Sequence, residues 1–116
     1  MGTLSDNFNR SEFECSCGCN FDTVDVVLLE SLEVIRKHFG QPITITSACR
    51  CPKHNALVGG AQRSQHVQGR AADIQVRDTD PSKVADFAED LGLSVGRYNY
   101  FTHVDSRTGI PARWSA

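Results

Sequence analysis

Two histidines and an aspartate are the residues of this chain whose types and spacing could bind a metal ion. His66 and Asp73 stand seven positions apart in the stretch SQHVQGRAAD, and His103 lies much later, in FTHVD. Two imidazoles and one carboxylate are a ligand set that zinc accepts, with a fourth position left for water or substrate. An open position of this kind is what a catalytic zinc site keeps for a water molecule.

The segment between His66 and Asp73 predicts a polar loop that turns back into a strand. Gly69 and the small alanines that follow it permit a tight turn. AADIQV (71–76) then has the pattern of a strand, and its alternation sets Asp73 on the face opposite to the aliphatic residues Ile74 and Val76.

A late strand can supply the third ligand. Alternation in FTHVD places Phe101, His103 and Asp105 on one face. If this strand lies beside the strand of Asp73, the three ligands can reach one point, with Asp105 close to a ligand histidine.

Simpler readings of the same residues stay open at this stage. His66 could be a solvated loop histidine, and His103 could form a cross-strand ion pair with Asp105. Asp73 is harder to explain in this way, because a carboxylate between apolar strand residues needs a partner when it is buried. Its position favours the metal hypothesis.

The other elements follow from hydrophobic periodicity and from stop signals. The expected order is a helix from about 24 to 39, a strand at 43–48, a short helix from Pro52, the strand at 71–76, a helix from Pro81 to Gly92, two strands around a turn near Asn99, and an edge segment at PARW. This order predicts a small α+β domain with an antiparallel sheet flanked by helices. We expect one domain over residues 1–116, with residues 1–20 as an irregular, cysteine-containing arm.

The first helix has a clear start, stripe and stop. Asp22 or Thr23 can cap its N-terminus, and Gly40 with Pro42 ends it. Its expected buried stripe consists of Val24, Val27, Leu28, Leu32, Ile35 and Phe39.

Bulk composition excludes several classes of function. The 116 residues carry a formal net charge of -2, which gives no electrostatic basis for binding nucleic acid. No apolar run approaches the roughly 20 residues that span a bilayer, so we expect no membrane insertion. The start MGTLSDNFNR has neither a basic nor an apolar signal region, so we expect synthesis in the cytoplasm without a signal peptide. We expect a monomer.

The five cysteines fall into two groups, Cys15, Cys17 and Cys19, then Cys49 and Cys51. Their spacings differ from the usual pairs of zinc ligands with two intervening residues. We expect a structural role, by packing, a bridge or adventitious metal, with Cys15 or Cys17 near Cys51 and no catalytic thiol.

Several motifs resemble one known family. SQHVQGRAADIQV resembles the S-x-H-x-x-G-x-A-x-D signature of the zinc D-alanyl-D-alanine carboxypeptidases, whose fold is shared with the hedgehog signalling domain. ITITSACR resembles a strand that precedes an arginine in that family, and FTHVDSR resembles its late strand. CPKHNALVGGA resembles the linking segment of the family's short, endolysin-like members from bacterial and phage genomes. The similarity runs from about Phe8 to Trp114.

The resemblance implies roles for five residues. It implies Zn²⁺ held by His66, Asp73 and His103. It implies that Arg50 holds a substrate carbonyl or stabilises an oxyanion, and that Ser64 contacts the substrate.

The sequence departs from the family pattern at the acidic residue. Several relatives carry Glu or Asp three residues before the final histidine, where this chain has Tyr100, and Phe101 replaces the first histidine of an H-x-H pattern. Asp105 is the nearest carboxylate, and we nominate it as the base or as a residue that orients a ligand histidine. The alternative is an exposed strand-end aspartate paired with Arg107.

Three functions follow from these observations. The first is a zinc peptidase that cleaves peptidoglycan peptides with D-centres, as a carboxypeptidase or endopeptidase, acting on the cell wall if it is phage-derived or exported by another route. The second is a zinc-binding module of the same fold without strong catalysis, with a binding or structural role such as in a phage particle. The third is a domain folded around cysteine-bound zinc.

Overall fold

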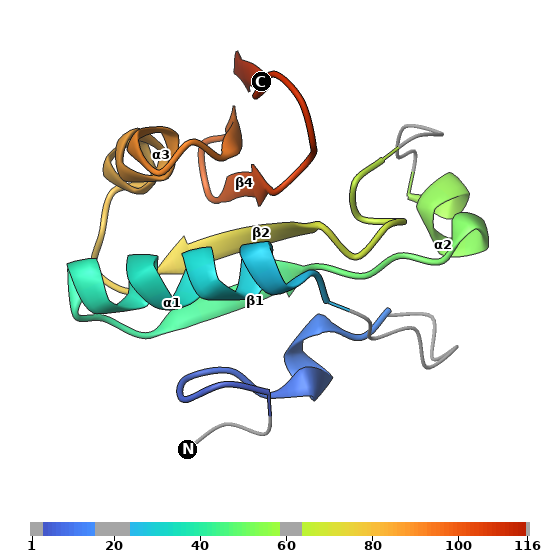
Figure 1. Ribbon diagram of the computed structural model, residues 1–116, viewed down its shortest axis with the longest axis horizontal. Helices are drawn as coiled ribbons and strands as arrows, with labels where there is room; N and C mark the ends of the chain where they lie inside the picture. Colours follow the sequence, from blue (N-terminus) through green and yellow to red (C-terminus); the bar gives the residue numbers. More distant parts are fainter. Residues whose placement is uncertain (1–3, 16–23, 59–63, 116) are drawn as a thin grey trace.

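A twisted five-stranded sheet forms the centre of the molecule (Figure 1). The computed structural model describes residues 4–15, 24–58 and 64–115. Within them, the strands are β1 (Ile43–Ser47), β2 (Ala71–Val76), β3 (Ser94–Arg97), β4 (Thr102–Asp105) and β5 (Arg113–Ser115), in the spatial order β1-β2-β4-β3-β5. The pairs among β1 to β4 are antiparallel, as expected, whereas β5 runs parallel to β3, so the sheet is mixed.

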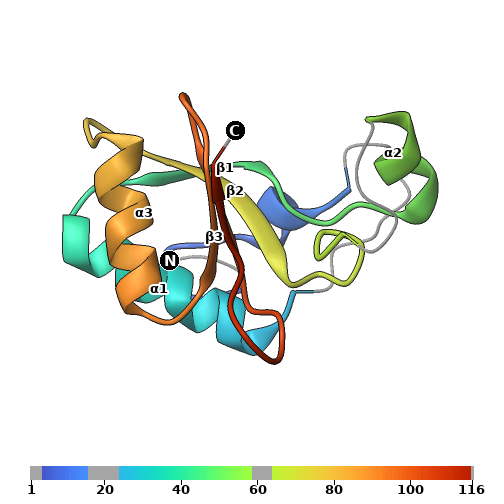
Figure 2. The same cartoon turned by 90° about the horizontal axis from the view of Figure 1, so that it is seen from above.

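Helices α1 (Val26–Phe39) and α3 (Pro81–Asp90) pack on the same face of the sheet (Figure 2). Each starts with an aspartate whose carboxylate accepts a backbone N–H: Asp25 from Leu28 and Asp80 from Ser82. A shorter helix, α2 (Pro52–Leu57), lies beyond the end of β1. No helix in the described ranges is both long and apolar enough to cross a membrane.

The start of α1 differs from the expectation. Residues 22 and 23, the expected caps, lie outside the described residues, and Asp25 caps the helix. Leu28 and the rest of the expected stripe turn towards the core, but Val27 is 57% exposed. The correction has a geometric reason, because successive helix residues are about 100° apart and the core face extends from Leu28 towards Leu29, which leaves Val27 on the opposite side of Leu28.

The alternation of side chains divides the sheet into two chemically different faces. Ala72, Ile74, Val95 and Val104 pack with residues of α1 and α3 in the hydrophobic core. The residues between them on the same strands point to the other face, which is therefore where polar side chains gather.

The described part of the N-terminal arm, residues 4–15, packs into the domain. Phe8 and Phe13 are fully buried in the core, with their rings edge to face and their centroids 6.0 Å apart. The Phe13 carbonyl accepts from the Cys49 amide at 2.9 Å, and the Cys15 thiol lies 3.4 Å from the Cys51 amide. The expected proximity of Cys15 and Cys51 is confirmed, whereas positions 17 and 19 lie outside the described residues. The arm thus supports the segment that follows β1.

Replacing Phe13 with alanine should lower the free energy of unfolding by about 3–5 kcal/mol, because the change leaves a cavity in the core. Denaturant unfolding measures this difference. Leu57→Ala is the control, since Leu57 is 75% exposed, and its effect should stay within about 0.5 kcal/mol. Equal stabilities of the two variants would show that the arm does not contribute to the core.

Candidate metal centre

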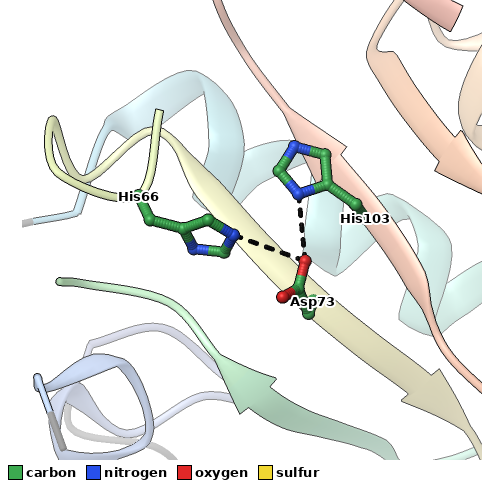
Figure 3. Close-up of side chains that lie close together, drawn as sticks. All are labelled: His66, Asp73 and His103. Carbon is green, nitrogen blue, oxygen red and sulfur yellow. Dashed lines mark hydrogen bonds and ion pairs between the residues drawn. The ribbon is translucent and has the colours of Figure 1, made fainter. Parts of the chain in front are cut away.

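Three buried side chains converge on the polar face of the sheet (Figure 3). They are His66, Asp73 and His103, and one ligand atom of each lies within 4.8 Å of the others. In the part of the chain that the structure describes, no other group of three or more His, Cys, Asp or Glu residues is arranged to hold a metal ion. The set that the sequence singled out is therefore assembled by the fold.

Strand register brings Asp73 and His103 together. They are direct partners in the antiparallel pair of β2 and β4, so their side chains are neighbours on one face. On the other side of Asp73, the pairing of β1 with β2 shifts between Ile45 and Ser47, which sets Ser47 opposite Asp73. Such a bulge re-aims a side chain, and here it turns Ser47 towards the site.

His66 reaches the cluster from a tight turn. Gly69 closes this turn with a φ of 70°, a left-handed conformation that glycine adopts readily. The His66 Nδ1–H donates to the Ala48 carbonyl at 2.6 Å, and the Arg50 amide donates to the His66 carbonyl. The other ring nitrogen, Nε2, lies 3.4 Å from an Asp73 carboxylate oxygen and therefore faces the centre of the cluster.

The His103 ring is also fixed by a hydrogen bond from the nitrogen that faces away from Asp73. Its Nε2–H donates to Asp105 at 2.8 Å, and its Nδ1 lies 2.9 Å from the Asp73 carboxylate. The Arg107 guanidinium donates two hydrogen bonds to the Asp105 carboxylate, from Nε at 2.8 Å and from Nη2 at 2.7 Å. Each histidine is therefore anchored by one ring nitrogen and presents the other to the centre, as metal-binding histidines do.

Hydrogen bonds within the cluster keep the Asp73 carboxylate ionised. Burial would raise the pKa of Asp73, but hydrogen bonds from His103 and His66 outweigh it and lower that pKa to about 2. Burial would lower the pKa of His103, but its hydrogen bonds to Asp105 and Asp73 raise it. In the metal-free cluster a proton on His103 Nδ1 can thus balance Asp73, and a metal ion can take the place of that proton. The ligand set fits a metal.

Arg50 lies at the edge of the cluster. Its Nη2 is 3.5 Å from the second Asp73 oxygen, while its Nε donates to Ser47 and its Nη1 donates to Asn55 Oδ1, both at 3.3 Å. The guanidinium is therefore fixed beside the three candidate ligands. Asn55, on α2, was missed by the sequence reasoning, because nothing in PKHNAL marks this amide as a partner of an arginine.

Ser64 begins the turn that carries His66. Its Oγ accepts the His66 amide at 3.2 Å, and its carbonyl accepts from Val67. This side chain therefore supports the loop, and it is half-buried.

Asp105 lies behind His103, on the side away from Asp73. The alternative interpretation was an exposed aspartate paired with Arg107. The pairing with Arg107 is confirmed, but the expected exposure is wrong, because Asp105 is fully buried. Burial would raise the pKa of Asp105, but hydrogen bonds from Arg107 and His103 hold it far below its usual value. Both oxygens already accept hydrogen bonds, so the geometry suits orienting His103 better than taking up a proton.

The position of the family's acidic residue is not part of the cluster. Tyr100 is 80% exposed and lines a separate cavity of about 560 Å³ that includes none of the three ligands. Phe101 stacks on Tyr98 with ring centroids 4.4 Å apart. Within the described ranges, the carboxylates in contact with the two histidines are those of Asp73 and Asp105.

Comparison with known families gives one result that bears on this site. A model of the family described as Peptidase M15 matches residues 6–105. The matched range contains the three candidate ligands and Arg50, and it ends at the last residue of β4. A search of curated proteins found no match.

Replacing Asp73 with alanine should abolish stoichiometric metal binding, because it removes a ligand and leaves two histidines without their shared partner. The measurement is metal content per chain after dialysis, by elemental analysis. Asp86→Ala, which removes an aspartate paired with Arg97 on the surface, should keep the metal of the parent. An Asp73→Ala protein that retains metal as tightly as the parent would mean that the site is misassigned.

Proposed function

Because the chain belongs to the Peptidase M15 family, we propose that it is a zinc metallopeptidase that hydrolyses peptidoglycan stem peptides at amide bonds of D-amino acids. The observation that carries this proposal is the convergence of His66, Asp73 and His103 at one point. Two imidazoles and a carboxylate suit Zn²⁺ and leave room for a further ligand. When bound, Zn²⁺ would polarise a carbonyl group and favour the ionisation of water.

The protein's own groups would position the ion and the substrate. His66 and His103 would offer Nε2 and Nδ1, whose orientations are set by the Ala48 carbonyl and by Asp105. Arg50 would hold the substrate carbonyl and stabilise the negative charge that develops on it, since its guanidinium is already fixed by Ser47 and Asn55.

The choice of substrate rests on the S-x-H-x-x-G-x-A-x-D signature at Ser64–Asp73. We propose that Ser64 contacts the peptide in addition to supporting its own loop. An endolysin-like role on the cell wall, reached through phage lysis or another export route, belongs to the same proposal.

A second candidate is a metal-binding domain of this fold with weak catalysis and a binding role, for example in a phage particle. The observation that favours it is that neither Tyr100 nor Asp105 is placed to act as a general base. Tyr100 stands in the acidic position but points to solvent, and both oxygens of Asp105 are engaged. Catalysis would then depend on a group other than these two.

Incubation of the zinc-loaded protein with purified peptidoglycan separates the two candidates. Mass spectrometry of the fragments should show stem peptides shortened at a D-residue, or newly freed peptide termini, and the Asp73→Ala protein should give none. Intact peptidoglycan after incubation with a fully zinc-loaded parent protein would favour the second candidate.

Arg50→Ala should leave metal content intact and lower the cleavage rate by roughly 10²–10³-fold, the effect of losing one oxyanion donor. Rates on a stem peptide, with metal content measured in parallel, provide the test. Arg77→Ala is the matched control, because Arg77 is exposed and follows β2, and it should cleave like the parent. Parental rates in Arg50→Ala would remove Arg50 from the mechanism.

Asp105→Asn should weaken metal affinity by about 10–100-fold, as expected for a residue that orients a ligand histidine. At saturating metal its rate should stay close to that of the parent. A general base would behave differently, with a fall of roughly 10²-fold or more in rate and unchanged affinity. Asp86→Asn, another aspartate paired with an arginine, controls for the loss of charge.

A further inference from the structure

Trp114 is the single tryptophan of the chain and lies on β5, beyond the range that the family model matches. Register places it in line with the metal cluster. Gly96 on β3 pairs with His103 on one side and with Trp114 on the other. The three residues therefore form one row across β4, β3 and β5 and share the face on which Asp73 lies.

The absence of a side chain at Gly96 lets Trp114 reach His103. A Cβ atom at position 96 would lie 2.5–2.6 Å from three atoms of the indole, so the ring occupies the space directly over the glycine. Across this gap the indole contacts the His103 imidazole, with ring centroids 4.9 Å apart.

Two further contacts fix the indole. Its Nε1–H donates to the Tyr98 hydroxyl at 3.0 Å, and the Arg107 guanidinium carbon lies 5.6 Å from the ring centroid, within cation–π range. Trp114 thus touches both ends of the hydrogen-bonded chain from Arg107 through Asp105 to His103. A hydrogen bond within that chain fixes one atom of the imidazole, whereas the indole limits the tilt of the ring.

We propose that Trp114 is a positioning residue of the metal centre, which holds the His103 imidazole in its ligating orientation by lying across Gly96. The inference rests on the proposed function, because it assumes that His103 binds the ion. It also accounts for β5, whose parallel pairing with β3 delivers the indole to this row.

Zinc affinity, measured by competition with a chelator, tests the proposal. Trp114→Ala should weaken affinity by about 10-fold or more, the scale for residues that support a ligand, and Trp114→Phe should recover most of it by keeping an aromatic ring. Phe87→Leu is the matched control, because Phe87 stacks on His38 with centroids 3.8 Å apart, in a ring–histidine pair outside the cluster. It should lower stability without changing zinc affinity.

Gly96→Ala gives a test that keeps the tryptophan. The added methyl should displace the indole and weaken zinc affinity as Trp114→Ala does. In the Trp114→Ala background the same methyl enters vacated space and should cost little more, so the two changes should be non-additive. Additive losses, or parental affinity in a folded Trp114→Ala protein, would overturn the proposal.

The fluorescence of Trp114 in the unmodified protein supplies a readout that does not depend on any variant. Titration with Zn²⁺ should change the emission and saturate at the stoichiometry found by the chelator assay, because the indole adjoins a ligand. An emission that stays constant while zinc binds would contradict the proposed contact. A parent protein that binds no zinc at all, in either assay, would instead overturn the metal centre, and this inference with it.

Discussion

The carboxylate of Asp73 is buried in the middle of the sheet, where a negative charge without partners would cost several kcal/mol. His66, His103 and Arg50 surround it and meet that requirement. Each of these partners is in turn held from outside by a carbonyl, a carboxylate or an amide oxygen. The Asp73 carboxylate is therefore surrounded by three side chains, and each of these is held by a further group. The same two histidines and carboxylate form the candidate cation site.

The pairing register of the strands positions the side chains of the site. Five residues are successive partners across the five described strands: Ser47, Asp73, His103, Gly96 and Trp114. The bulge in β1 and the parallel β5 complete the two ends of this row. Because α1 and α3 cover the opposite face, the charged side chains of this row lie apart from the apolar core.

The clustering of the three candidate ligands could be predicted from the sequence, because strand alternation reports the face on which a side chain lies. That local rule placed Asp73 correctly. It could not reveal that Phe13 enters the core or that Asn55 holds Arg50, because both depend on packing between distant segments. The proposed role of Trp114 could not be predicted either, since it requires the parallel pairing of β5 and the absence of a side chain at Gly96, whose place the indole takes. Contacts between distant segments leave no periodic pattern in the sequence from which they could be predicted.

X-ray absorption at the zinc edge tests the central claim most directly, because it reports which atoms surround the ion. Ligation by His66, Asp73 and His103 predicts nitrogen and oxygen neighbours at about 2.0–2.2 Å, with the scattering pattern of two imidazoles and no sulfur. A shell of sulfur at about 2.3 Å would place the zinc on the cysteines instead and would contradict the account.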